Sequence, residues 1–214
     1  MRYRSYLFDF DGTLVDSMPY YERAMLSVLE ENGIAYGEDL IKTITPLGYA
    51  GPAGYYKEVL GLTLSEREIL SDMKSFAYYA YAHKVPIKEN VRETLQALAS
   101  AGADLHILTA SPHDVLDICI ERLGLGKFFK NVWSTDDFGL SKTDPEIYKG
   151  AAERIGRATG EILFLDDNLL ALAAAKRAGM PTVGVYDASS LAYAEEIRAA
   201  ADGYIKDFLE LLSL

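Results

Sequence analysis

The sequence predicts an α/β fold in which a doubly wound parallel sheet carries an all-helical insert. Short apolar runs alternate with amphipathic helical stretches, which is typical of parallel strands joined by crossover helices. The alternation stops over residues 16–83, where apolar and aromatic residues recur at helical spacing without a convincing strand. We therefore expect an α/β core domain of residues 1–15 and 84–214 and a helical domain of residues 16–83.

The individual elements follow from apolar runs and from the glycines that end helices. Strands are expected at residues 6–8, 103–108, 132–133, 162–165 and 182–185. Helices are expected at residues 89–101, 113–123 and 145–155. Each of these helical stretches is followed directly by a glycine: Gly102, Gly124 and Gly156. Within the helical domain, residues 45–54 are rich in glycine and proline and predict a loop or a very short helix start.

Composition limits the classes of function. Half of the 214 residues are hydrophobic and a quarter are charged, the proportions of a globular chain with a core. The formal net charge of −11 opposes binding to nucleic acid, whose affinity comes from lysine and arginine. No apolar run approaches the roughly 18 to 20 residues of a membrane helix, and the first residues lead into a strand without an apolar leader. We expect a cytoplasmic monomer or weak homodimer with neither nucleic acid nor a membrane as partner.

Two pairs of aspartates follow predicted strands. Asp9 and Asp11 come after the first strand, and Asp166 and Asp167 come after the fourth. Open α/β sheets bind ligands at the carboxyl ends of their strands, so we expect the four carboxylates to converge there. Carboxylates that lie close together raise one another's pKa unless a cation lies between them. Hard oxygen ligands, in a chain with 3 histidines, favour Mg²⁺ over zinc or copper. Aspartates at such turns also serve as helix caps. Because two such pairs occur, we favour a metal or acid–base site over simple capping.

Two further strand ends carry groups that suit an anionic oxygen. Thr109 places a hydroxyl at the end of the second strand, and Ala110 and Ser111 lead into a helix with free backbone N–H groups. Lys142 lies in a loop just ahead of another helix. Taken singly, Thr109 is more commonly a helix cap and Lys142 a solvated side chain. Their order along the chain, after the first acidic pair and before the second, favours a phosphoryl site.

That order of motifs resembles a known family. The run Asp9-Phe10-Asp11-Gly12-Thr13, followed by Thr109, Lys142 and Asp166-Asp167, is similar to the four-motif signature of the haloacid dehalogenase superfamily. The helical domain resembles the small C1-type cap of the branch that includes phosphoglycolate phosphatases and β-phosphoglucomutases. The resemblance implies a Rossmann-like core with a helical cap. It also implies Mg²⁺-dependent hydrolysis of a phosphoglycolate-like or sugar-phosphate-like monoester through an aspartyl-phosphate intermediate.

The resemblance implies a role for each matching residue. Asp9 would attack phosphorus and Asp11 would be the general acid and base. The expected catalytic residues are Asp9, Asp11, Thr109 and Lys142. The residues expected to bind phosphate or substrate are Gly12, Thr13, Ala110, Ser111, Tyr49 and Tyr55. The expected Mg²⁺ ligands are Asp9, the backbone carbonyl of Asp11, Asp167 and Asp166, the last through water unless it pairs with Lys142.

Two positions depart from the family pattern. Thr143 stands where a proline commonly follows the lysine, and Ala171 stands where a further aspartate often lies four residues beyond the metal-binding one. Neither position is a primary catalytic group. The departures leave the composition of the metal shell open.

Two alternative functions stay open. A sugar-phosphate mutase must bind a second phosphate, usually through a basic residue of the specificity loop, but residues 46–52 contain no arginine or lysine and Lys57 is the nearest cation. Tyr49, Tyr55 and Tyr56 would instead line a substrate pocket, or they would pack in the cap core. A non-catalytic phospho-aspartate switch of the receiver type places similar groups at a sheet edge, but in another order and without a helical insert.

Overall fold

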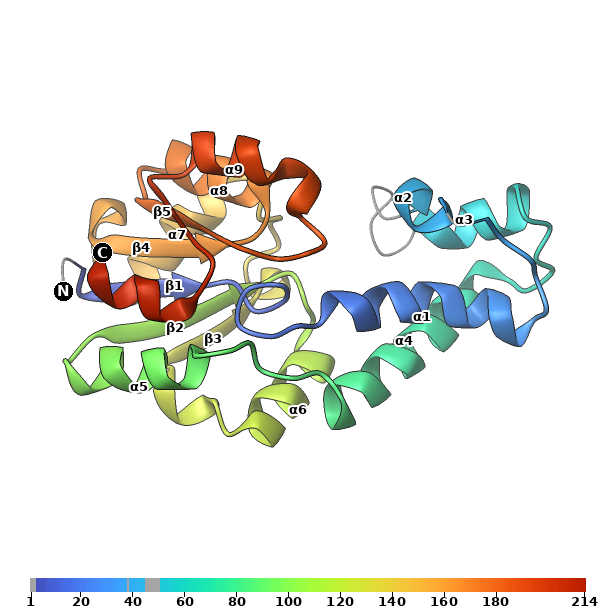
Figure 1. Ribbon diagram of the computed structural model, residues 1–214, viewed down its shortest axis with the longest axis horizontal. Helices are drawn as coiled ribbons and strands as arrows, with labels where there is room; N and C mark the ends of the chain where they lie inside the picture. The colour runs from blue at the N-terminus through green and yellow to red at the C-terminus, as the bar shows by residue number, and fades with distance from the viewer. Residues whose placement is uncertain (1–2, 38, 45–50) are drawn as a thin grey trace. The chain divides into compact units, whose positions relative to one another are not determined.

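The computed structural model describes residues 3–37, 39–44 and 51–214. The chain divides into an α/β unit, residues 1–16 and 86–214, and a helical unit, residues 17–85 (Figure 1). These limits lie one or two residues from the domain limits expected from the sequence. Tyr49 lies outside the described residues, as does most of the expected specificity loop.

The α/β unit is built on a parallel sheet with the strand order β3-β2-β1-β4-β5-β6 (Figure 1). The strands are β1 Ser5–Phe8, β2 Asp104–Thr109, β3 Asn131–Ser134, β4 Ile162–Asp166, β5 Thr182–Val185 and β6 Gly203–Ile205. All residues of β1, β4 and β5 are buried, as expected for strands covered on both faces. The strand order reverses between β1 and β4, and such switch points are where open α/β sheets bind ligands.

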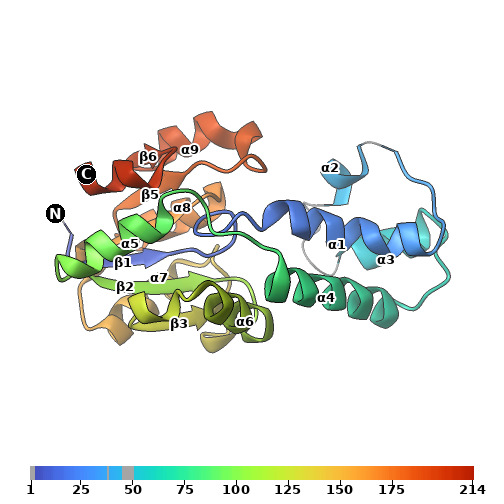
Figure 2. The ribbon, with the colours of Figure 1, turned by 60° about the horizontal axis from the view of Figure 1, so that its bottom comes forward.

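Helices cover both faces of this sheet. They are α5 Val91–Ser100, α6 His113–Leu123, α7 Pro145–Ile155, α8 Leu169–Arg177 and α9 Ala194–Ala200. The short 3₁₀ helices are η2 Gly126–Phe128, η3 Thr135–Asp137, η4 Thr159–Glu161, η5 Leu191–Tyr193 and η6 Phe208–Ser213. Right-handed crossovers on either side of β1 place α5 and α6 on one face and α7 and α8 on the other (Figure 2). The helices α6 and α7 end at Gly124 and Gly156, both left-handed, as the sequence predicts.

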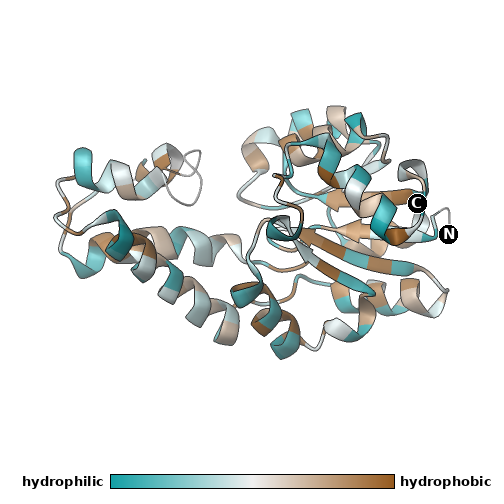
Figure 3. Ribbon diagram, turned by 180° about the vertical axis from the view of Figure 1, so that it is seen from behind, coloured by the Kyte–Doolittle hydropathy of each residue, from teal (hydrophilic) through white to brown (hydrophobic). Residues whose placement is uncertain are grey.

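The core beneath α7 and α8 holds the central strands in place. Leu7 of β1 and Phe164 of β4 are fully buried in one cluster with Ala174 and Ala175 of α8, and the apolar character of the strands is visible in Figure 3. Small side chains let α8 lie close to the sheet. Because α8 begins at Leu169, one residue beyond the pair Asp166 and Asp167, this packing fixes where that acidic pair lies.

The helical unit consists of α1 Met18–Glu31, α2 Leu40–Ile44, α3 Gly51–Glu58 and α4 Glu66–His83. Its described residues contain no strand, and its core includes Met25, Ile69 and Met73. Tyr56 is buried in that core and its hydroxyl donates to the Met25 carbonyl at 2.7 Å. Tyr55 is partly buried against the same core, so its expected contact with substrate stays a prediction.

The chain leaves the α/β unit after Asp16 and returns to it at Pro86, and the two segments at this junction are hydrogen-bonded to each other. The Asp16 N–H donates to the Pro86 carbonyl at 3.0 Å, and Val15 forms an antiparallel bridge with Ile87. The α/β unit therefore holds the two ends of its interrupted chain side by side. Among the described residues, no helix has both the length and the apolar character required to cross a membrane.

Candidate active site

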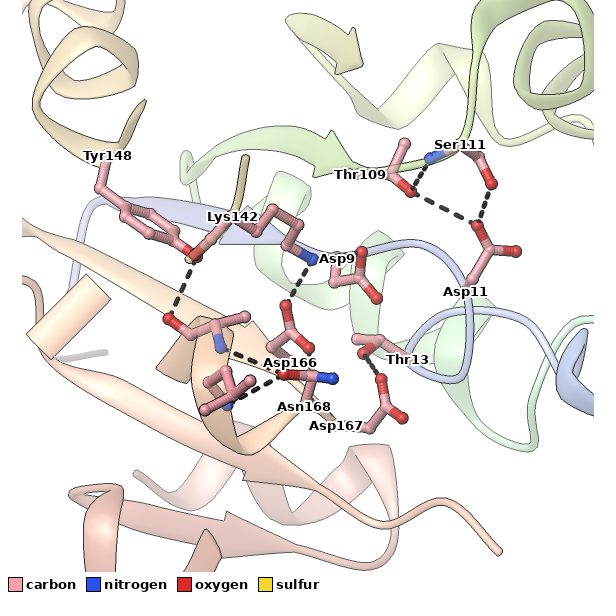
Figure 4. A network of polar contacts seen from close by, with 12 residues as sticks. Asp9, Asp11, Thr13, Thr109, Ser111, Lys142, Tyr148, Asp166, Asp167 and Asn168 are labelled. Carbon is pink, nitrogen blue, oxygen red and sulfur yellow. Dashed lines mark hydrogen bonds and ion pairs between the residues drawn. The ribbon is translucent and has the colours of Figure 1, made fainter. Parts of the chain in front are cut away.

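The expected site residues of the α/β unit meet at the carboxyl ends of three adjacent strands (Figure 4). Phe8 of β1 is level with Ile107 of β2 and Leu165 of β4. The next residue, Asp9, donates its N–H to the Leu165 carbonyl at 2.9 Å, which carries the ladder up to the site. Register therefore sets Asp9 beside Asp166 at the switch point of the sheet.

Lys142 is the buried cation of this cluster. Its Nζ lies 2.6 Å from Asp9 Oδ1 and 2.5 Å from Asp166 Oδ2, and its side chain is 11% exposed. The other oxygen of Asp166 accepts the Asn168 N–H at 2.7 Å. Asp166 thus pairs with Lys142 and a backbone amide. Its expected contact with Mg²⁺ through water stays a prediction.

The charge balance of the cluster is negative. Burial raises the pKa of Asp9 to about 7, an effect that Lys142 opposes and that Asp166 and Asp11 reinforce. Burial, followed by the charges of Asp166 and Asp9, holds the pKa of Asp167 well above its usual range. Burial lowers the pKa of Lys142, but the two carboxylates more than offset this and raise it. Three buried acids therefore face one lysine, and a further cation would favour the ionised forms of Asp9 and Asp167.

The donor set fits a hard divalent cation. Asp9, Asp166 and Asp167 are buried, and each offers a carboxylate oxygen within 4.8 Å of the others. Gly12 leaves room beside them: its φ is +73°, and a Cβ built on it would lie 2.8 Å from Asp167 Oδ2. Carboxylate oxygens with an uncompensated charge are the ligands that Mg²⁺ prefers. These residues are consistent with the expected Mg²⁺ site.

A second group of contacts holds Asp11 at the other side of the site. Ser111 Oγ donates to Asp11 Oδ2 at 2.6 Å, and Thr109 Oγ1 lies 3.4 Å from the same oxygen. The Ser111 N–H donates to Thr109 Oγ1 at 3.1 Å, which fixes the two hydroxyls relative to each other. Thr13 is buried and donates to Asp167 Oδ1 at 3.4 Å. Ala110, between the two hydroxyl residues, is exposed.

Two supporting residues are not among those that the sequence singled out. The Tyr148 hydroxyl lies 2.8 Å from the Lys142 carbonyl and 3.1 Å from the Ala171 carbonyl, so it ties the lysine loop to α8. Asn168 caps α8, since its Oδ1 accepts the N–H groups of Leu170 and Ala171. From the sequence alone, Tyr148 cannot be distinguished from an ordinary core residue of a helix. Asn168, which stands between a strand and a helix, is a recognisable signal for a helix cap.

A cavity of about 790 Å³ lies at the opposite, amino edge of the sheet. It is lined by Tyr3, Arg4, Gly160, Glu161, Lys176, Gly179, Met180, Pro181 and Asp202. None of the expected site residues lines it. The clustered carboxylates, and not this cavity, are therefore the candidate site.

Comparison with known proteins decides the family. A model of the haloacid dehalogenase-like hydrolases matches residues 3–179. The chain belongs to the haloacid dehalogenase-like hydrolase family. It is 31% identical over 185 residues to the pyrophosphatase PpaX of Bacillus velezensis, with 86% of this chain and 83% of the relative covered. It is 29% identical to a phosphorylated carbohydrates phosphatase of Thermotoga maritima, with 83% and 82% covered.

Solved structures of the family share the fold along the whole chain. A Thermotoga maritima protein provisionally called a β-phosphoglucomutase superposes with a TM-score of 0.83 at 26% identity, covering 98% of both chains. CbbY of Rhodobacter sphaeroides, solved in complex with phosphate, superposes with a TM-score of 0.80 at 20% identity, covering 98% and 96%. The match and the relatives named as phosphatases confirm the predicted family, fold class and enzyme class, a haloacid dehalogenase-like phosphatase.

Proposed function

We propose that this protein is a Mg²⁺-dependent phosphatase that hydrolyses a small phosphoglycolate-like or sugar-phosphate-like monoester through an aspartyl-phosphate on Asp9. The observation that carries the proposal is the contact between Asp9 Oδ1 and the buried Lys142 ammonium at 2.6 Å, beside Asp166 and Asp167. Relatives named for phosphorylated carbohydrates and phosphoglycolate support the substrate class.

Asp9 and Asp167 would hold Mg²⁺ with the backbone carbonyl of Asp11, while Asp166 supports the site through its pairing with Lys142. The ion, when bound, supplies positive charge to the carboxylates and to the phosphoryl oxygens. The rise in the pKa of Asp9 caused by burial would be reversed by that charge. Asp9 would then be ionised, as a nucleophile must be.

Asp9 and Asp11 divide the chemistry between them. A carboxylate oxygen of Asp9 forms a bond to phosphorus while the ester P–O bond breaks, and the leaving oxygen takes a proton from Asp11. In the second step Asp11 accepts a proton from water, the water oxygen binds phosphorus, and the bond to Asp9 breaks. The Ser111 hydroxyl, 2.6 Å from Asp11 Oδ2, orients that carboxyl for both transfers.

Lys142 and Thr109 would stabilise the transferring group. The Lys142 ammonium is fixed by two buried carboxylates, so it presents its charge without reorganisation. The hydroxyl of Thr109 and the backbone N–H of the exposed Ala110 lie at the end of β2 and would bind the remaining oxygens. Gly12 and Thr13 are expected to bind phosphate with them.

The decisive experiment measures phosphate release from an aryl phosphate, phosphoglycolate, several sugar phosphates and pyrophosphate, with Mg²⁺ and with EDTA. Wild type and Asp9→Asn are compared, since the amide keeps the shape of the side chain but cannot form the aspartyl-phosphate. We expect release that requires Mg²⁺ and falls at least about 10³-fold in Asp9→Asn. Unchanged release with EDTA or in the variant would contradict the proposal.

A sugar-phosphate mutase is the second candidate, because the chain resembles the Thermotoga maritima protein provisionally called a β-phosphoglucomutase at 26% identity. The same assay separates the two functions. A mutase converts a hexose 1-phosphate to its 6-phosphate without net phosphate release, which coupled detection of the product would show. A phospho-aspartate switch would instead accumulate phosphorylated protein and turn over neither ester.

A further inference from the structure

Lys88 lies in the segment that re-enters the α/β unit before α5. Its backbone N–H donates to the Leu14 carbonyl at 3.0 Å, next to the bridge between Val15 and Ile87. This pairing lays the segment along the loop that follows Asp9 and Asp11. The Lys88 side chain is only 16% exposed, although two polar residues, Glu89 and Asn90, follow it in the sequence.

The ammonium of Lys88 joins three parts of the α/β unit. Its Nζ donates to the Gly12 carbonyl, to the Tyr186 carbonyl at 2.8 Å and to Asp187 Oδ2 at 2.7 Å. An ammonium has three N–H donors, and here each has an acceptor. The loop after β1 is therefore tied through one cation to the loop after β5.

The peptide held by Lys88 belongs to the proposed reaction centre. Gly12 follows Asp11, and its Cα faces the Asp167 carboxylate so closely that a Cβ would lie within 3 Å of it. Its carbonyl leads to Thr13, which donates to Asp167. A shift of this peptide would move both the acid–base group and a proposed metal ligand.

The partner of Lys88 is itself a buried acid. Asp187 is 4% exposed, and its charge adds to the negative field at Asp167. Burial raises the pKa of Asp187, but hydrogen bonds from Lys88 and Ser189 more than offset this and lower it, so Asp187 is ionised. Lys88 thus neutralises a further buried carboxylate whose charge acts on Asp167.

We propose that Lys88 is a positioning residue of the phosphatase, which holds the Gly12 turn against Asp167 and pairs with Asp187 so that the turn is anchored to β5. The inference rests on the proposed function, because it concerns how the same reaction centre is held. The sequence pattern singled out neither Lys88 nor Asp187.

The test compares four variants in steady-state phosphate release. Lys88→Met keeps the aliphatic stem but cannot donate to the Gly12 carbonyl. Asp187→Asn leaves Lys88 free to donate to both carbonyls. The double variant Lys88→Met/Asp187→Asn also removes the negative charge of Asp187. Its Tm and kcat therefore distinguish a loss of stability from a loss of positioning. The matched control is Lys176→Met, because Lys176 likewise binds a backbone carbonyl, that of Ala200 at 2.7 Å, and an aspartate, Asp202 at 2.9 Å, away from the site.

We expect Lys88→Met to lower kcat about 10- to 100-fold, with KM within about twofold, because a misplaced reacting group costs rate more than binding. Asp187→Asn should lower kcat by less than about fivefold, and Lys176→Met should leave it within about twofold. In the double variant the Tm should recover relative to Lys88→Met, since no buried acid is left unpaired, while kcat stays low.

Two results would overturn the positioning role. One is a folded Lys88→Met protein with the kcat of wild type. The other is a double variant in which kcat recovers together with the Tm, because Lys88 would then serve only to neutralise Asp187. A wild-type protein that releases no phosphate from any ester contradicts the proposed function itself, and so is distinguishable from both.

Discussion

The two units of the molecule differ in the charged side chains that they bury. Among the described residues, the buried carboxylates, Asp9, Asp166, Asp167 and Asp187, all lie in the α/β unit. The helical unit buries no charged side chain in its described part, and its fully buried Tyr56 is satisfied by a backbone carbonyl. Burying charge opposes folding unless each charge is paired. The α/β unit therefore buries and pairs charge at its candidate site, whereas the described core of the helical unit is apolar.

The largest expected effect is the removal of the buried cation. Lys142→Met leaves Asp9 and Asp166 without their partner, so we expect phosphate release to fall at least about 10³-fold. Without Mg²⁺, the unfolding free energy of the α/β unit should fall by about 3–5 kcal/mol, as measured by urea denaturation. Lys149→Met, which removes an exposed pair with Glu146, should change neither quantity measurably. Phosphate release by Lys142→Met within tenfold of the wild-type rate would contradict a role of Lys142 in the reaction.

A glycine in each unit gives the next comparison. Gly12 and Gly33 both have positive φ, +73° and +66°, but a Cβ on Gly12 would meet Asp167 whereas one on Gly33 would meet nothing within 4 Å. Both alanine variants should lose about 1–2 kcal/mol of stability to backbone strain. Gly12→Ala should in addition lose about 100-fold in kcat, because Asp167 must move. Equal kcat values for the two variants, measured at saturating Mg²⁺, would show that the close approach of Gly12 to Asp167 has no part in the reaction.

One contribution to the stability of the α/β unit, that of the buried His106, should be lost in mild acid. Burial lowers the pKa of His106 to about 4, below its usual 6.5, so the unfolded chain binds the proton more tightly. Stability from this group is intact above about pH 6.5 and is lost as the pH falls towards 4, by about 2 kcal/mol at pH 5. Urea denaturation of wild type and His106→Gln at pH 7.5 and pH 5 isolates this contribution, since Asp9 and Asp167, with raised pKa values, act in the opposite direction in both proteins. Identical pH dependence of the two proteins would contradict it.

The smallest effect belongs to the helical core. Tyr56→Phe removes the hydrogen bond to the Met25 carbonyl and should cost about 1 kcal/mol of unfolding free energy. The kcat should stay within about twofold of wild type, because the hydroxyl is enclosed in the helical core. Tyr79→Phe, on an exposed tyrosine of the same unit, is the control and should change neither stability nor kcat. A large loss of kcat in Tyr56→Phe would show that the helical core does more than stabilise its own unit.

Much of the fold and of the site could be predicted from local patterns. Apolar runs locate five of the six strands, because buried parallel strands are continuous hydrophobic segments. The sixth, β6 Gly203–Ile205, has three residues and begins with glycine, so it carries no such signal. The acidic pairs could be found because strand ends collect ligand groups in this architecture.

The partners of those groups could not be predicted, because they depend on distances across the sheet. The pairing of Asp166 with Lys142 depends on the position of a loop 24 residues away in the sequence, and the structure shows this ion pair at 2.5 Å. Lys88 eluded prediction for a further reason. Two of its three acceptors are backbone carbonyls, which leave no trace in the identity of the residues that carry them.

The hydrogen bond between Asp16 and Pro86 closes the junction at which the helical unit is inserted into the α/β unit. Since the α/β unit brings these two residues together itself, the helical unit is topologically a loop, closed at a junction that the sheet maintains. Loop-closure entropy grows slowly, by about 0.6 kcal/mol for each doubling of length. A replacement of residues 17–85 by a short glycine–serine connection should therefore leave a protein that folds around the same sheet, and grafts of other helical inserts at this junction should be tolerated. We therefore expect the sheet and the insert to fold as separate modules.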